Sequence, residues 1–289
     1  MITIRQQFAL SPMLLIALAA PVHSADSAAI GMVLDVQGAV LVTEHGRSSP
    51  LQLLARLAPD IRIELPPQSK TSITLYSNRS VYRLTGPATV DVTKDVVKVL
   101  QGRPPEIKVM GERQLAVAPT GALVTGAYRM RSLQLASPMV LTSPENGSVL
   151  LDTRPVFAWE GVQARRFNIT VQQQGGGPAF RATVTGTGWT LPEGVRLQYG
   201  TGYVWNVTAE ELPGSETSGG QGRFSLATLA EIEQIAALQP AEADSIEDWV
   251  YYAAMLQQRQ IRAEARKAWQ RIALERPDLQ RASELARQP

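Results

Sequence analysis

The chain has 289 residues, of which 44% are hydrophobic and 19% are charged. This length is enough for two or three domains, and the composition is typical of globular domains rather than of a disordered chain. The sequence contains no cysteine, which excludes disulfides, thiol nucleophiles, thiolate metal sites and a lipid attached to cysteine. The 28 basic and 26 acidic side chains leave a formal net charge of +2, which is too small to predict nucleic-acid binding.

The first 24 residues predict a secretory signal peptide. Arg5 precedes an apolar run over residues 13–20, and Val22 and Ser24 fit a signal-peptidase site, so we expect cleavage after Ser24. The alternative is a retained N-terminal anchor, although this apolar run is shorter than the roughly 20 residues that span a bilayer. The mature protein is therefore expected to be periplasmic or secreted.

Residues 25–137 predict a β domain built from short, closely spaced strands. Apolar and polar residues alternate over residues 36–42 and 72–76, and the period of two is that of a pleated strand. Turn signals at residues 77–80 and at Gly86-Pro87 separate further strands over residues 81–84, 89–92 and 96–100.

This region resembles the FecR domain, the periplasmic module of iron-responsive and related envelope proteins. The resemblance rests on Gly31-x-Val33-x-x-Val36-x-Gly38-x-Val40-x-Val42, Leu57-Ala58-Pro59-Asp60-x-x-Ile63, residues 69–84 and Val99-Leu100-Gln101-Gly102. The usual Gly-Asp and Asp-Gly turns of the family are replaced by Pro59-Asp60 and Asn78-Arg79, which also suit turns. Anti-sigma regulators of the family carry a cytosolic segment and a membrane helix, and we expect neither here.

Residues 138–228 predict a second β domain. Phe157 and Trp159 share one face of a strand, and residues 167–171 alternate apolar and polar side chains. The spacing of Leu197, Gly200 and Tyr203 resembles the tyrosine corner of fibronectin type III sandwiches, in which a tyrosine hydroxyl bonds to the backbone a few residues upstream. The expected fold is a fibronectin type III-like β-sandwich.

Residues 229–289 predict a helical tail, so the whole chain is expected to be mainly β with α-helices at its end. Thr228-x-x-Glu231 and Ser245-x-x-Asp248 match capping boxes. The spacing resembles one tetratricopeptide repeat, with the larger aromatic residues as core and small residues at the close-packing positions. The residues that carry it are Trp249, Tyr252, Ala253, Leu256, Ala265, Trp269, Ile272 and Pro277. One repeat buries its apolar face poorly, so the hairpin is expected to pack on the sandwich, pair with a second copy or receive a partner helix in an apolar groove.

Nothing in the sequence predicts catalysis or a cofactor. The expected mature chain has one histidine, His45, which cannot build a histidine-rich metal site and is expected on a solvated turn. The local motifs of serine hydrolases, zinc proteases and nucleotide-binding proteins do not occur. We therefore predict a protein that is not an enzyme.

Candidate contact residues lie in the helical tail. Tyr251 falls off the apolar stripe and is expected to be exposed, and the basic side of the second repeat helix suggests partner-binding residues Arg259, Arg262 and Arg266. The acidic residues Glu242, Asp244, Glu247 and Asp248 have two interpretations, a calcium or partner site and charges that complement a helix dipole, of which the second is favoured.

The expected function is that of a non-catalytic periplasmic binding or scaffold protein that acts through protein–protein contacts. One form of this function is that of a signalling accessory, which binds the ectodomain of a membrane sensor. The alternative is a structural envelope protein that binds peptidoglycan or another glycan through its β domains. Both expectations rest on analogy between folds.

Overall fold

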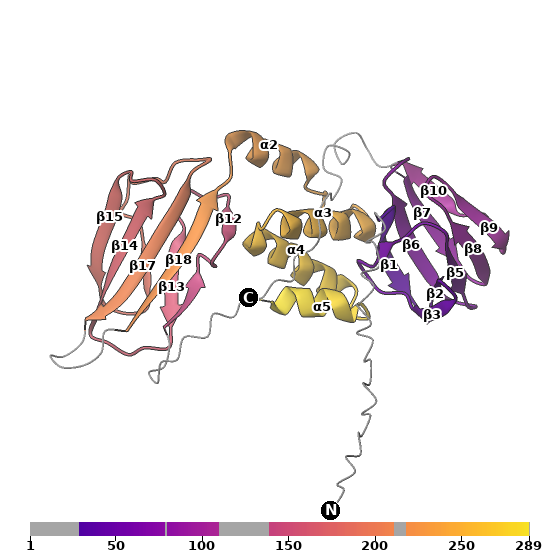
Figure 1. The fold of residues 1–289 in the computed structure, drawn as a ribbon, viewed down its shortest axis with the longest axis horizontal. Coiled ribbons are helices and arrows are strands. Elements are labelled where there is room, and N and C mark those ends of the chain that lie inside the picture. The colour runs from indigo at the N-terminus through magenta and orange to yellow at the C-terminus, as the bar shows by residue number, and fades with distance from the viewer. Residues whose placement is uncertain (1–28, 79, 110–138, 211–217, 289) are drawn as a thin grey trace, which may run out of the picture.

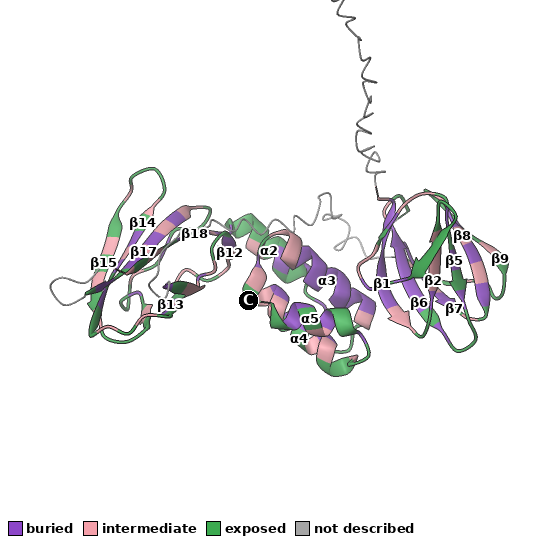
Figure 2. Ribbon diagram, turned by 60° about the horizontal axis from the view of Figure 1, so that its bottom comes forward, coloured by how far each residue is buried: buried purple, intermediate pink, exposed green. Residues whose placement is uncertain are grey.

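The computed structural model describes residues 29–78, 80–109, 139–210 and 218–288. They form a first β domain (residues 30–109), a second β domain (residues 139–227) and a helical unit (residues 228–288). The helical unit lies between the two β domains in both views of the ribbon (Figures 1 and 2). The chain is thus mainly β with a helical end, as predicted; the boundaries at 137/138 and 228/229 stay predictions. The predicted signal peptide lies outside the described residues.

The first β domain is a sandwich of two five-stranded antiparallel sheets, with strand orders β10-β7-β6-β1-β4 and β3-β2-β5-β8-β9. Its strands are β1 (Gly31–Gln37), β2 (Leu41–Glu44), β3 (Arg47–Pro50), β4 (Arg56–Leu57), β5 (Ile61–Leu65), β6 (Lys70–Leu75), β7 (Ser80–Thr85), β8 (Ala88–Val92), β9 (Val97–Gln101) and β10 (Glu106–Val109). In β5 the buried Ile61, Ile63 and Leu65 alternate with exposed Arg62 and Glu64, as a strand covered on one face requires.

The strand predicted through residues 36–42 is wrong at its centre. Gly38 has a φ of +77°, which glycine adopts without steric cost, and the chain turns there between β1 and β2. The predicted turn at residues 77–80 is confirmed, because β6 and β7 pair across it from Leu75 and Ser80 to Lys70 and Thr85.

The second β domain is a fibronectin type III-like sandwich. Its sheets have strand orders β11-β13-β16 and β12-β18-β17-β14-β15, and all pairs are antiparallel except β12 with β18. The strands are β11 (Val140–Ser143), β12 (Ser148–Leu150), β13 (Val156–Glu160), β14 (Arg166–Gln173), β15 (Ala179–Val184), β16 (Gly188–Thr190), β17 (Gly202–Glu210) and β18 (Gly219–Leu226). Phe157, Trp159 and Trp205 fill the core between the sheets. The predicted tyrosine corner is confirmed, since the backbone N–H of Gln198 donates to the Tyr203 hydroxyl at 2.9 Å.

The helical unit consists of α2 (Leu229–Leu238), α3 (Ile246–Gln258), α4 (Arg262–Glu275) and α5 (Gln280–Arg287). The first capping box is confirmed, because the Thr228 hydroxyl accepts from the Glu231 N–H and the Glu231 carboxylate accepts from the Thr228 N–H. The second capping box is wrong in its hydrogen bonds. α3 begins after Ser245, but the Ser245 hydroxyl accepts no backbone N–H of the helix and donates to the Asp248 carboxylate at 2.6 Å.

The predicted core of the helical hairpin is buried. Trp249, Ala253, Ala265 and Trp269 are all at most 8% exposed, and the Arg271 guanidinium stacks 4.4 Å from the centre of the Trp249 ring. The likeness of α3 and α4 to a tetratricopeptide repeat stays a prediction.

Candidate functional site

The predicted open groove of the helical unit is filled by the chain itself. Every residue of α3 from 247 to 256 is buried, as the continuous purple of that helix in Figure 2 shows. These residues share one core with α2, α4 and α5 and with the first β domain, which contributes Met32, Leu34, Leu53 and Val81. The apolar stripe therefore holds this chain together, and no face of α3 is left for a partner helix.

Two carboxylates at the start of α3 anchor the helical unit to the first β domain. Glu247 accepts from the Arg83 Nε at 2.8 Å and from the Ser72 hydroxyl at 2.9 Å, and Asp248 accepts from the Lys108 Nζ at 2.7 Å. Glu247 and Asp248 are 7% and 6% exposed. The Arg83 and Lys108 side chains are 31% and 41% exposed, so solvent screens both pairs, and removal of one partner costs less than the roughly 3–5 kcal/mol that is typical of a fully buried pair.

The sequence offers two interpretations of these carboxylates: charges that complement the helix dipole, or a calcium or partner site. Both lie in the first turn of α3, where the dipole favours them. Their contacts with the first β domain are an additional role, which sequence reasoning missed because Arg83 and Lys108 are more than a hundred residues away.

The protonation of Glu247 reflects its position in this contact. Burial raises the pKa of the carboxyl, but hydrogen bonds from Arg83, from the backbone and from Ser72 outweigh burial and hold the pKa below its ordinary value. The carboxyl therefore stays ionised near neutral pH, as the pair with Arg83 requires.

A second anchor joins the helical unit to β1 through Arg276, the residue that follows α4. The Arg276 guanidinium donates to the Asp35 carboxylate at 2.7 Å and to the Asp278 carboxylate at 2.7 Å. Hydrogen bonds from Asp278 and Asp35, opposed by burial, raise the pKa of Arg276 further above its ordinary value. Asp35 is 5% exposed, so its charge depends on Arg276 for compensation.

Other contacts attach the helical unit to the second β domain. The N–H of Val149 donates to the carbonyl of Gln260 at 2.9 Å, and Glu145 forms ion pairs with Arg262 and Arg266. The helical unit thus bonds to both β domains and fixes how they are placed.

The four predicted partner-binding residues are used within the chain to different extents. The expected exposure of Tyr251 is wrong: it is 6% exposed in the shared core, and burial raises the pKa of its hydroxyl to about 12. Arg262 and Arg266 bind Glu145, and Arg259 is half-buried at the end of α3. Binding of a partner by these residues stays a prediction. In the structure, Tyr251, Arg262 and Arg266 make contacts within the chain instead.

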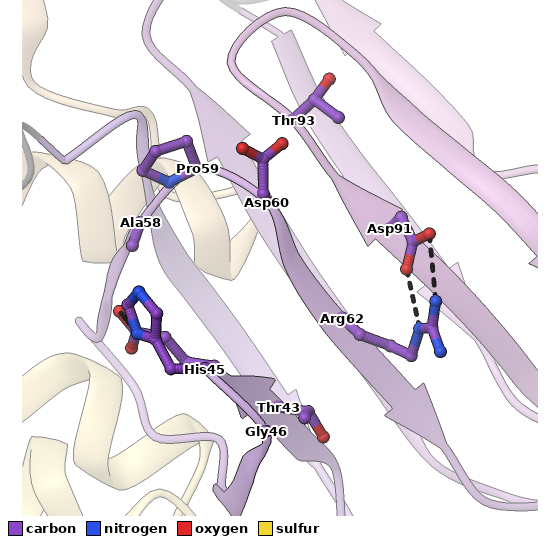
Figure 3. A pocket seen from close by; sticks show the side chains of 10 residues that line it. Thr43, His45, Gly46, Ala58, Pro59, Asp60, Arg62, Asp91 and Thr93 are labelled. Atoms are coloured by element: carbon purple, nitrogen blue, oxygen red, sulfur yellow. Dashed lines mark hydrogen bonds and ion pairs between the residues drawn. The ribbon is translucent and has the colours of Figure 1, made fainter.

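The first β domain carries a polar hollow of about 640 Å³ at the turn between β2 and β3 (Figure 3). His45 and Gly46 stand on one side and Asp60 on the other, and Arg62 donates to both oxygens of Asp91 at 2.8 and 3.3 Å. The remaining lining residues are Thr43, Glu44, Ala58, Pro59 and Thr93.

The charged groups of this hollow largely satisfy one another. The hydrogen bond from Arg62 is the main cause that lowers the pKa of Asp91, and the same bond raises the pKa of Arg62. His45 is exposed, as predicted, and its ring lies 3.7 Å from a Glu44 carboxylate oxygen. The hollow offers hydrogen-bonding groups to a polar ligand.

Within the described residues, no group of three or more histidine, cysteine or acidic side chains is placed to hold a metal ion. None of the helices described is long and apolar enough to cross a membrane.

No protein-family model matches the sequence, and no curated protein matches it. Solved structures with a similar fold are fibronectin type III domains. The fn3 domain of the human collagen alpha-1(XX) chain is 18% identical with a TM-score of 0.26, over 42% of this chain and 96% of that chain. A two-domain fibronectin type III segment from chicken tenascin is 13% identical with a TM-score of 0.23, over 64% of this chain and 82% of that chain. The FN1–FN3 domains of chicken CNTN1 are 11% identical with a TM-score of 0.24, over 69% of this chain and 58% of that chain. These values concern the fold and carry no functional argument.

Proposed function

We propose that this chain is a non-catalytic scaffold of the cell envelope that binds other proteins through its two β domains. The observation that carries the proposal is the position of the helical unit between the two β domains. Its apolar and charged side chains make contacts with both of them. A unit used in this way sets the spacing of the two β domains. In the part of the chain that the structure describes, the outer surfaces of the two β domains stay open to a partner.

The proposed location and class of partner rest on patterns in the sequence. The signal-peptide pattern of residues 1–24 supports export, and the FecR-like pattern of the first β domain supports an envelope protein. A sensor ectodomain in the membrane is the partner that this combination favours. The absence of any cysteine is compatible with a chain that relies on packing and ion pairs alone.

The alternative function, binding of peptidoglycan or another glycan, is favoured by one feature. The hollow beside His45 is open and combines charged and hydroxyl side chains with apolar surface from Ala58 and Pro59, a mixture that suits a sugar ring and its hydroxyls. We place it second because Arg62 and Asp91 already bond to each other.

Photo-crosslinking in the cells that produce the protein tests these proposals. The crosslinking amino acid replaces one exposed residue at a time in the full-length chain: Leu100 of the first β domain, Val156 of the second or Leu274 of α4. Crosslinks from Leu100 or Val156 to one envelope protein, with none from Leu274, are the expected result. Wall fragments captured by the crosslinking amino acid at His45, a further position beside the hollow, would favour the glycan function. Crosslinks from Leu274 alone would contradict a role centred on the β domains.

Truncation at Thr228 is a poorer test. It would remove α3 and expose Leu34, which is 0% exposed in the complete chain, together with the other side chains of the first domain in the shared core. Loss of a partner after truncation would then report damage to the first β domain as readily as loss of a contact.

A further inference from the structure

The first β domain has two edge strands that are consecutive in the sequence. β9 ends one sheet and β10 ends the other, and only residues 102–105 connect them. Both edges therefore lie along one margin of the sandwich, which Figure 1 shows on the side where β9 and β10 are labelled. Each edge strand has one paired neighbour in its sheet, so among the residues that the structure describes no strand lies on the other side of either backbone.

Apolar side chains gather at this margin. Val96, Leu100, Ile107 and Val109 are 55%, 45%, 56% and 70% exposed, and they make up four of the nine large hydrophobic side chains that the described residues expose. Natural edge strands usually carry charges or a covering loop that prevent pairing with another chain.

The register of β10 shows which way these side chains point. Ile107 lies opposite Tyr82, which belongs to the core between the two sheets, whereas Lys108 lies opposite Val81, which packs against the helical unit. Ile107 and Val109 thus share the inner face of the sandwich and are still more than half exposed. Apolar surface therefore continues beyond the buried core along this margin.

The charges around the margin are mainly basic. Lys94, Lys98 and Arg103 are exposed. Of the acidic residues nearby, Glu106 is bound by Arg83 at 3.1 Å and Asp91, which lies opposite Lys98, is bound by Arg62 at 2.8 Å, which leaves Asp95. Such a rim attracts negative charge and repels positive charge.

We propose that the β9–β10 margin binds an extended segment of a partner protein in which apolar residues alternate with acidic ones. The segment adds a strand to the free edge of β9, so that its inward apolar side chains face Ile107 and Val109 of the opposite sheet. Its outward acidic side chains then lie on the same face of the sheet as Lys98, which pairs with the outward-facing Asp91. Main-chain hydrogen bonds supply much of the affinity, and the alternation and charge supply specificity. This inference deepens the proposed scaffold function by naming a partner chemistry for its first β domain, and it rests on that function.

Binding of short synthetic peptides to the full-length protein tests the proposal, with fluorescence anisotropy as the readout. The probe peptide alternates valine with glutamate. One comparison peptide alternates valine with lysine, and another is the probe with every second backbone amide methylated so that it cannot donate to a strand edge. We expect the lysine and the methylated peptides to bind at least about tenfold more weakly than the probe, since like charges and unmade main-chain bonds each oppose binding.

Two variants locate the contact. Ile107→Ser should weaken binding of the probe, and Leu274→Ser should leave it unchanged, because Leu274 is 85% exposed on α4 and away from the margin. Both changes are at exposed positions, so both variants are expected to fold.

Three results would overturn the proposal. Equal binding of the methylated peptide would show a contact that does not use the strand edge. Absence of binding by the probe would show a margin closed to an added strand. A concentration-dependent dimer that Ile107→Ser dissociates would show that a second copy occupies the margin. None of these results would remove crosslinks from the second β domain, so failure here is distinct from failure of the scaffold function.

Discussion

Tyr203→Phe removes one hydroxyl from the second β domain and little else. The Tyr203 ring is 3% exposed and stacks on Phe224 with centres 5.5 Å apart, and phenylalanine keeps that contact. What is lost is the acceptor for the Gln198 N–H. Gln198 is itself exposed, so water can reach the freed N–H. The cost is therefore that of an ordinary hydrogen bond, about 0.5–1.5 kcal/mol, rather than that of a buried donor left without a partner.

Urea unfolding followed by tryptophan fluorescence measures this loss. Trp159, Trp189 and Trp205 lie in the second β domain and report on it directly. With a denaturant slope of roughly 2 kcal/mol/M, the transition midpoint should fall by about 0.3–0.8 M. Tyr199→Phe is the matched control. Tyr199 is 42% exposed, so loss of its hydroxyl should leave the transition midpoint unchanged. Equal midpoints for Tyr203→Phe and wild type would refute the argument that the tyrosine corner stabilises this domain.

Other perturbations test the helical unit. Thr228→Ala should destabilise α2 by about 1 kcal/mol through loss of its cap, seen as faster amide hydrogen exchange in the first turn of α2 and unchanged exchange in α4. Ala253→Leu should cost about 1–3 kcal/mol, because residue 253 is 0% exposed and the core has no room, whereas Ala237→Leu on the exposed side of α2 should be neutral in thermal unfolding. The lowered pKa of Glu247 predicts a contribution to stability that is complete above the ordinary value near 4.5 and lost as the pH falls through the lower folded-state pKa. Urea midpoints measured across that acid range should therefore depend less on pH in Glu247→Gln than in wild type, and equal dependence would contradict the assignment.

Local patterns predicted the parts of the fold that depend on local chemistry. The alternation in β14, the turn between β6 and β7, and the spacing from Leu197 to Tyr203 all encode contacts within a few residues or between neighbouring strands, and all are present. The strand predicted through residues 36–42 is wrong at Gly38, because the apolar residues on either side of this turn keep the period of two that is typical of a strand. Charge contacts between domains could not be predicted, since no pattern links Asp35 to Arg276 across 241 residues.

One signal of the contact between domains was nevertheless present in β1. Met32, Val33 and Leu34 are three consecutive apolar residues, whereas a strand covered on one face alternates apolar and polar side chains. Val33 points into the sandwich core, and Met32 and Leu34 belong to the core shared with the helical unit. A strand with two apolar faces requires a cover on each, and the helices at the far end of the chain supply the second one. The first β domain is therefore completed by residues that lie more than a hundred positions away, and the spacing between the β domains is fixed by the same contacts that stabilise one of them.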